Sequence, residues 1–175
     1  MKKLIAIGLA VLLFTACQQE VRYTQTSPEI DHVKAAQADY LKGDWESYLT
    51  HYAPDAKIFN NATESNPKTP QQIVENWKVT LAGVSSYSIL DDQQAIEMVI
   101  DDKGETWVNF WGVWKGTYSD LNKTFEIPIH ITSQFVDGKI VKEYGYWDSS
   151  PVVIARMEFE AAQKAAADST AIPVN

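Results

Sequence analysis

Residues 125–148, FEIPIHITSQFVDGKIVKEYGYWD, contain the pattern that decides the fold. Apolar and polar residues alternate on both sides of Asp137-Gly138, and an Asp-Gly pair between two alternating segments is typical of a two-residue β-hairpin turn. Such a turn pairs Val136 with Lys139, which sets the register of both strands. The stretch therefore predicts two antiparallel strands joined by a tight turn.

Helical patterns precede this hairpin in the chain. Ser27-Pro28 and Thr69-Pro70 each place a capping residue before a proline, as at the start of a helix. Helices are predicted over residues 28–43, 44–54 and 70–83, a strand over residues 56–60, several strands over residues 86–148 and a terminal helix over residues 151–168. Helices followed by an antiparallel sheet indicate an α+β domain.

The start of the chain is predicted to be a targeting signal followed by a membrane anchor. Residues 4–14 form an uncharged apolar run, too short to span a hydrocarbon core of about 30 Å but typical of a secretory signal. Phe14-Thr15-Ala16-Cys17 resembles the bacterial lipobox, whose cysteine is acylated. We expect a lipoprotein signal peptide over residues 1–16, lipidation of Cys17 and a polar tether over residues 17–27. The alternative is an ordinary cleaved signal followed by an incidental cysteine.

The residue after the cysteine bears on location. It is Gln18 rather than an aspartate, which by resemblance to Gram-negative lipoproteins favours the outer membrane. A lipid-modified Cys17 would hold the chain on the lipid bilayer, because more than one acyl chain gives stable anchoring. The expected location is therefore the cell envelope.

Composition excludes several classes of partner. The 175-residue chain has 23 acidic and 15 basic residues, a net charge of −8. Without residues 1–16, which contain Lys2 and Lys3, the counts are 23 and 13 and the net charge is −10. So acidic a protein repels phosphate backbones, and no nucleic-acid partner is expected. A single cysteine excludes an internal disulfide and a multi-cysteine metal site, and neither a metal site nor a cofactor is predicted.

A set of short motifs resembles the nuclear transport factor 2-like superfamily, and within it the SnoaL-like group. In chain order they are Gly43-Asp44-Trp45-Glu46, Tyr52-Ala53-Pro54-Asp55-Ala56, the helix at Pro70, Phe135-Val136-Asp137-Gly138-Lys139-Ile140 and Tyr146-Trp147-Asp148. The resemblance covers residues 30–153. It implies a SnoaL-like domain over residues 28–153, followed by a C-terminal helix and tail over residues 154–175.

The resemblance also implies an architecture. Members have a cone-shaped fold, in which a bent, antiparallel-rich sheet wraps the N-terminal helices and leaves a pocket at its open end. Both enzymes and non-catalytic proteins share this fold, so the fold alone does not fix the function. Ketosteroid isomerase carries its aspartate base where this sequence has Asn60 and a tyrosine where it has Ala36. Isomerisation by that mechanism is therefore excluded.

Register suggests which side chains line the pocket. If the pairing set by Asp137-Gly138 continues without interruption, Thr132 lies opposite Glu143, and His130 lies on the same face. By resemblance to ketosteroid isomerase this polar face lines the pocket, whereas a bulge near the turn would exchange the faces. The predicted catalytic pair is His130 with Glu143, since a carboxylate near an imidazole fixes its tautomer for acid/base work. The alternative is a hydrogen-bonded histidine in a ligand cavity that does no chemistry.

Aromatic residues suggest the chemistry of the ligand. Aromatic walls suit a small apolar or aromatic molecule. The predicted ligand-binding residues are Tyr40, Asn60, Trp77, Trp111, Thr132 and Trp147.

Three functions remain open from the sequence. They are a membrane-anchored domain that binds a small apolar or aromatic ligand, an acid/base enzyme of dehydratase, cyclase or hydrolase type, and a non-catalytic assembly module. A large apolar face also predicts a homodimer built on the outer side of the sheet, unless the C-terminal helix covers it. That face holds Phe125, Ile127, Ile129, Ile131, Phe135, Ile140, Tyr144 and Tyr146.

Overall fold

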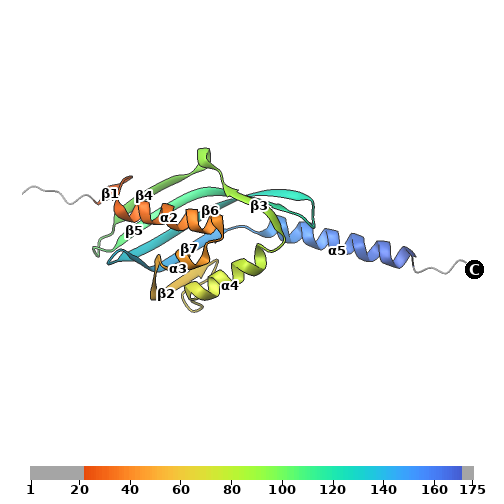
Figure 1. Cartoon of the computed structure of the whole chain (residues 1–175), viewed down its shortest axis with the longest axis horizontal. Coiled ribbons are helices and arrows are strands. Elements are labelled where there is room, and N and C mark those ends of the chain that lie inside the picture. Colours follow the sequence, from red (N-terminus) through yellow and green to blue (C-terminus); the bar gives the residue numbers. More distant parts are fainter. Residues whose placement is uncertain (1–21, 171–175) are drawn as a thin grey trace, which may run out of the picture.

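The computed structural model describes residues 22–170 (Figure 1). The predicted signal peptide (residues 1–16), the predicted lipidation site Cys17 and the tail over residues 171–175 lie outside the described residues. None of the helices within residues 22–170 has the length and apolar character that a membrane crossing needs.

One mixed sheet of seven strands forms the body of the molecule (Figure 1). The strands are β1 (Tyr23–Thr24), β2 (Tyr52–Asn60), β3 (Val84–Ile89), β4 (Ala95–Ile100), β5 (Thr106–Tyr118), β6 (Lys123–Val136) and β7 (Lys139–Trp147). Their order is β1-β4-β5-β6-β7-β2, with β3 paired to the far end of β5. All pairs are antiparallel except β2 with β7, which is parallel.

Three helices pack on one face of this sheet and a fourth extends beyond it (Figure 1). They are α2 (Pro28–Lys42), α3 (Trp45–Leu49), α4 (Pro70–Thr80) and α5 (Ser150–Thr170), with a short 3₁₀ turn over Asp91–Gln93. Ser27 caps α2 by accepting from the Ile30 amide at 3.2 Å, and Gly43 ends it with a φ of 69°. Thr69 and Gln72 form a reciprocal capping box at the start of α4. These helix starts lie where the sequence predicted them.

The second helix is shorter than predicted. It ends at Leu49, and Tyr52 already belongs to β2, which lies alongside β7. Pairing with a strand almost 90 residues away in sequence overrides the local helical pattern.

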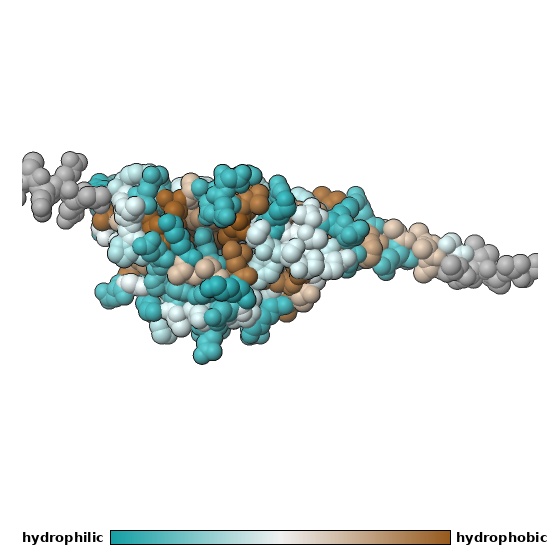
Figure 2. All heavy atoms as spheres, turned by 45° about the horizontal axis from the view of Figure 1, so that its top comes forward, coloured by the Kyte–Doolittle hydropathy of each residue, from teal (hydrophilic) through white to brown (hydrophobic). Residues whose placement is uncertain are grey.

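The N-terminal edge strand begins inside the segment predicted to be a tether. Tyr23 and Thr24 pair with Val99 and Met98 of β4, and Arg22 donates to Asp102 at 2.6 Å. In Figure 2 the visible face is mostly hydrophilic, with hydrophobic side chains gathered in separate patches.

The β6–β7 hairpin contains a bulge that decides which side chains face the helices. Val136 pairs with Lys139 as predicted, and Phe135 pairs with Ile140, but Gln134 pairs with Lys142. Val141 is therefore one extra residue in β7. Beyond the bulge the register is shifted by one residue, so odd-numbered residues of β6 oppose odd-numbered residues of β7.

The hydrophobic core lies between this sheet and helices α2, α3 and α4. Its buried members come from α2, α3, α4 and the strands, and partly buried aromatic side chains pack against them. The largest fully buried side chains include Phe110, Ile30, Ile58, Ile140 and Val108.

Candidate functional site

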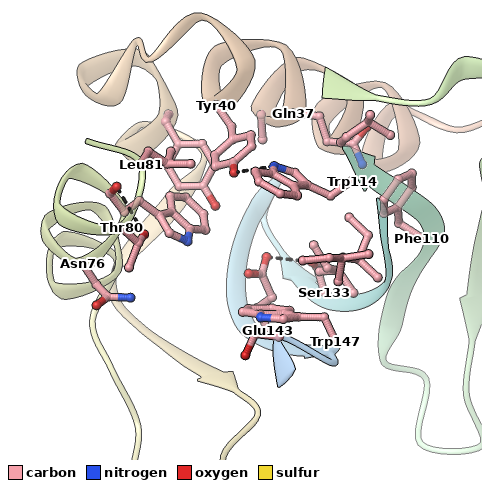
Figure 3. Close-up of a pocket in the computed structure, with 18 of the residues that line it drawn as sticks. Gln37, Tyr40, Asn76, Thr80, Leu81, Phe110, Trp114, Ser133, Glu143 and Trp147 are labelled. Carbon is pink, nitrogen blue, oxygen red and sulfur yellow. Dashed lines mark hydrogen bonds between the residues drawn. The ribbon is translucent and has the colours of Figure 1, made fainter. Parts of the chain in front are cut away.

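A cavity of about 340 Å³ lies between the helices and the concave face of the sheet (Figure 3). Its size is within the lower range of small-molecule sites. At one end, Ser149 and Val152 at the start of α5 contribute to its wall. The aromatic residues that line it are Tyr40, Tyr48, Tyr52, Trp77, Phe110, Trp114, Tyr118 and Trp147.

Glu143 is the polar centre of this cavity. It lies on β7 with 5% of its surface exposed. Its Oε2 accepts hydrogen bonds from the Tyr52 hydroxyl at 2.9 Å and from Ser133 Oγ at 3.1 Å. The Tyr52 hydroxyl is also hydrogen-bonded to the hydroxyl of Tyr48. Within residues 22–170 nothing donates to Oε1, so this oxygen is available to a molecule in the cavity.

The surroundings of Glu143 favour its neutral form. Burial raises the pKa of the Glu143 carboxyl, and the hydrogen bonds from Tyr52 and Ser133 only partly oppose that rise. Burial, together with the nearby Glu143, also raises the pKa of Tyr48 and Tyr52 well above the usual tyrosine range. Both tyrosines therefore act as neutral hydrogen-bond donors or acceptors around the carboxyl.

The wall opposite Glu143 is aromatic. Tyr40 from α2 and Trp77 from α4 meet edge to face with ring centroids 4.8 Å apart. Trp114 Nε1 on β5 donates to the Tyr40 hydroxyl at 3.1 Å, which leaves the Tyr40 proton free for a ligand (Figure 3). Burial raises the pKa of Tyr40, so this hydroxyl also stays neutral.

Glycines on the sheet allow the aromatic rings of the cavity to lie flat. A β-carbon at Gly112 would come within 2.5 Å of the Phe110 ring, and one at Gly145 within 2.7 Å of the Trp147 ring. A β-carbon at Gly116 would come within 2.0 Å of the Trp114 ring. Because each ring lies across a residue without a side chain, the sheet contributes wide apolar surfaces and leaves the space above them open.

Four of the predicted site residues line this cavity. They are Tyr40, Trp77, Glu143 and Trp147. Asn60 does not; it lies at the end of β2, where its side-chain oxygen approaches Gly145.

The prediction that His130 faces Glu143 in the pocket is wrong. His130 lies on the outer face of the sheet, opposite Tyr146, stacked on Trp111 with ring centroids 4.8 Å apart. Thr132 and Trp111 lie on the same outer face, where Thr132 donates to Asn109 at 2.7 Å. The bulge at Val141 is the reason, because it turns the even-numbered residues of β6 away from the cavity.

Because of the same bulge, the apolar face predicted to form a dimer surface is not the outer face of the sheet. Ile127, Ile129 and Ile131 line the cavity instead of facing outward, and Phe135 and Ile140 belong to the core. Phe125 packs against Tyr118 in a smaller cluster beside them. Of the eight predicted residues only the two tyrosines lie on the outer face, beside Trp107, Trp111 and His130.

The three polar residues hydrogen-bonded around Glu143 were missed from the sequence. Tyr48 and Tyr52 were placed on one helix, so their spacing of four residues gave no reason to look for a carboxylate partner. Ser133 had a visible signal, since it is the one polar residue in the row Ile127, Ile129, Ile131, Ser133, Phe135.

No family model and no curated protein matches the sequence. A candidate polyketide cyclase from Xanthomonas campestris matches in structure with a TM-score of 0.58 and 15% identity, over 75% of this chain and 98% of that chain. A nuclear transport factor 2-like protein of unknown function from Burkholderia pseudomallei matches with a TM-score of 0.58 and 11% identity, over 74% and 98% of the two chains. This chain has the nuclear transport factor 2-like fold.

A third structure has a bound small molecule. It is a hypothetical protein with a ketosteroid isomerase-like fold from Catenulispora acidiphila, in complex with trimethylamine, with 18% identity and a TM-score of 0.54 over 71% and 89% of the two chains. The predicted α+β, cone-shaped nuclear transport factor 2-like fold with its C-terminal helix is thus confirmed. At these identities the nuclear transport factor 2-like fold is what the likeness establishes, and the activity needs its own argument.

Proposed function

We propose that this protein is a membrane-anchored domain that binds a small, mainly apolar or aromatic molecule in its internal cavity. The observation that carries the proposal is a single buried carboxyl in a cavity whose lining is mostly apolar and aromatic, with a few neutral polar side chains such as Gln37 and Asn76. Aromatic walls supply apolar contact area, and a few fixed polar groups orient the ligand. The trimethylamine complex of a protein with the same fold supports small-molecule binding by such a domain.

Two polar groups would orient the ligand. Glu143 Oε1 lies on the sheet side of the cavity and the Tyr40 hydroxyl on the helix side. Neither group is committed fully to internal hydrogen bonds. A ligand with an apolar body and one polar group would therefore satisfy Glu143 and bury its remainder against the rings.

A neutral apolar probe tests the binding proposal. Titration of tert-butylbenzene into the chain lacking residues 1–17 should quench or shift tryptophan fluorescence, since Trp77, Trp114 and Trp147 line the cavity. Ile129→Trp, which fills the cavity, should weaken binding by about tenfold or more. Thr132→Trp, on the outer face of the same strand, is the matched control. Absence of binding to the wild-type chain both of this probe and of a charged probe of the same shape would contradict the proposal.

A second candidate function is acid/base catalysis by Glu143. The observation in its favour is that burial raises the pKa of this carboxyl while Oε1 remains open to the cavity. His130 has no part in this version, because it lies on the other face of the sheet. Mass spectrometry of a molecule co-purified with the wild-type chain and with Glu143→Gln separates the two functions. Conversion of that molecule by the wild type alone would favour the enzyme.

The assembly proposed for the protein uses the corrected outer face. Trp111 and Tyr146 are 42% and 48% exposed there, more than such rings usually are on a monomer. We propose that a second copy of the chain covers this aromatic surface in a homodimer, while lipidated Cys17 holds the assembly on the bilayer of the cell envelope.

A further inference from the structure

The described side chains that line the cavity can carry a negative charge but no positive one. Among the residues that line it, Glu143 is the one acidic side chain, and no lysine, arginine or histidine of the described chain joins it there. Its hydrogen-bond partners, Tyr52 and Ser133, are neutral. An ionised Glu143 would thus be a buried negative charge without a counter-ion, which is costly unless something in the cavity neutralises it.

The rest of the cavity suits the opposite charge. Rings surround the space on both sides: Tyr40, Tyr48 and Trp77 come from the helices, and Trp114 and Trp147 from the sheet. The faces of such rings attract cations through their quadrupoles, most strongly for tryptophan. The whole chain adds to this preference with its net charge of −8, which raises the local concentration of cations.

We propose that the ligand is an organic cation, a protonated or quaternary amine with an apolar or aromatic body, whose charge is neutralised by Glu143 Oε1 and the surrounding rings. This inference rests on the proposed ligand-binding function and names the chemical class of its ligand. The competing class is a neutral molecule with a hydrogen-bond acceptor, such as a carbonyl compound, which would bind protonated Glu143.

The two classes differ in the sign of their pH dependence. In the empty cavity burial raises the pKa of Glu143. A cation binds the ionised carboxylate, so its affinity should fall as the solution is acidified and its binding should release a proton. A neutral acceptor needs the protonated carboxyl, so its affinity should rise on acidification.

A matched pair of probes tests the inference. Phenyltrimethylammonium and tert-butylbenzene have the same shape and differ by one permanent positive charge. Both are titrated into the chain lacking residues 1–17, which retains every core and cavity residue of the described range 22–170, with tryptophan fluorescence as the readout. The cation should bind at least about tenfold more tightly than its isostere at pH 8, and this preference should shrink at pH 5.

Variants identify the group responsible. Glu143→Gln keeps the shape and can still accept from Tyr52 and Ser133, so it should bind tert-butylbenzene as the wild type does and lose the preference for the cation. Glu126→Gln, which removes one exposed carboxylate on the outer face, should retain that preference. Circular dichroism verifies that both variants are folded, and the pH series on the wild type gives an independent answer if Glu143→Gln is not.

The two probe titrations test the organic-cation inference and the ligand-binding proposal separately. Binding of tert-butylbenzene with equal or greater affinity than phenyltrimethylammonium would overturn the organic-cation inference and leave the ligand-binding proposal standing. A cation preference that survives in Glu143→Gln would overturn it as well. If neither probe binds the wild-type chain, the ligand-binding proposal itself fails.

Discussion

Trp114 lies so close over Gly116 that any side chain at position 116 would overlap its ring. The same indole donates to the Tyr40 hydroxyl on α2, so one residue of β5 forms the cavity wall and also connects the sheet to a helix. The missing side chain at Gly116 is what lets the ring reach that position. Space for a ligand in this fold thus depends on where the strands have no β-carbon.

Gly116→Ala should therefore disturb the cavity. The new methyl group forces the Trp114 ring to move, which breaks its hydrogen bond to Tyr40 and should lower the free energy of unfolding by about 1–3 kcal/mol. Gly83→Ala is the matched control, because its nearest neighbour would be Asp120 at 4.0 Å. Urea unfolding followed by circular dichroism measures both variants. Equal stability of the two variants would show that the ring relaxes freely.

Glu143 should make stability depend on pH in an unusual direction. Burial raises its pKa above the ordinary value of about 4.5, so the folded chain binds this proton more tightly than the unfolded chain. Its contribution is complete below that ordinary value and is lost as the pH rises through the folded-state pKa. Relative to Glu143→Gln, the wild type should lose unfolding free energy as the pH rises above about 4.5.

Urea unfolding of both chains across that pH series measures the difference. Glu126→Gln, at an exposed position paired with Lys115 at 2.8 Å, is the control for removal of a carboxylate. A constant difference between wild type and Glu143→Gln would mean that Glu143 does not titrate differently in the folded state.

The hairpin shows how much of this site could be predicted from the sequence. Asp137-Gly138 specified the turn, and Val136 pairs with Lys139 as expected. The bulge at Val141 left no sequence signal, because nothing about a valine marks an unpaired position, yet it exchanged His130 for Ser133 on the cavity face. Local patterns thus predicted the helices and strands, whereas a single extra residue in β7 decided which side chains of β6 face the cavity.

The parallel pairing of β2 illustrates the other kind of miss. Tyr52 lies within a helical pattern locally, and only its place beside β7 makes it a strand residue that reaches Glu143. Such long-range pairing is decided by packing in three dimensions and not by neighbours in the sequence. The helix caps at Ser27 and Thr69 depend on adjacent residues alone, and both were predicted.

A second titrating group, His32, should make the free energy of unfolding change with pH in the direction opposite to Glu143. His51 lies 2.9 Å from both His32 and Asp39, between α2 and β2. Burial, and then the nearby His51, lower the pKa of His32 below its ordinary 6.5, with Lys139 adding to this effect and Glu29 opposing it. The unfolded chain then binds the proton first, so stability should be complete above pH 6.5 and fall as the pH drops below it.

His32→Gln removes this dependence while it keeps a donor for His51. Relative to that variant, the wild type should lose unfolding free energy as the pH falls below 6.5. His130→Gln on the outer face provides the control for removal of an imidazole. Parallel stability curves for wild type and His32→Gln would contradict the assignment.

Anchoring through Cys17 predicts a simple change in location. Cys17→Ala removes the only thiol that could be acylated, so the protein should move from the membrane fraction to the soluble fraction. Fractionation of cells followed by immunoblotting measures the distribution, with a Ser27→Ala variant as the control. A mutant protein that remains with the membranes as the wild type does would exclude lipidation as the anchor.

A glutamate on the outer face of the sheet and a glutamate on its cavity face should have different effects. Trp111→Glu places a charge on the aromatic surface formed with His130 and Tyr146, where the fold itself has no need of an apolar group. The wild-type chain lacking residues 1–17 should sediment as a dimer in analytical ultracentrifugation, and Trp111→Glu should sediment as a folded monomer.

Ile129→Glu is the comparison that distinguishes the two faces. Ile129 lies opposite Trp147 and lines the cavity, so Ile129→Glu would put a second carboxylate into a cavity that has no basic side chain among its described lining residues, and it should lower the free energy of unfolding by about 3 kcal/mol or more. A dimer that survives Trp111→Glu, or a monomeric wild type, would exclude the outer aromatic surface as the interface. If Ile129→Glu instead gave a stable, folded monomer, the predicted apolar face would be the outer one after all, and the bulge at Val141 would be misplaced.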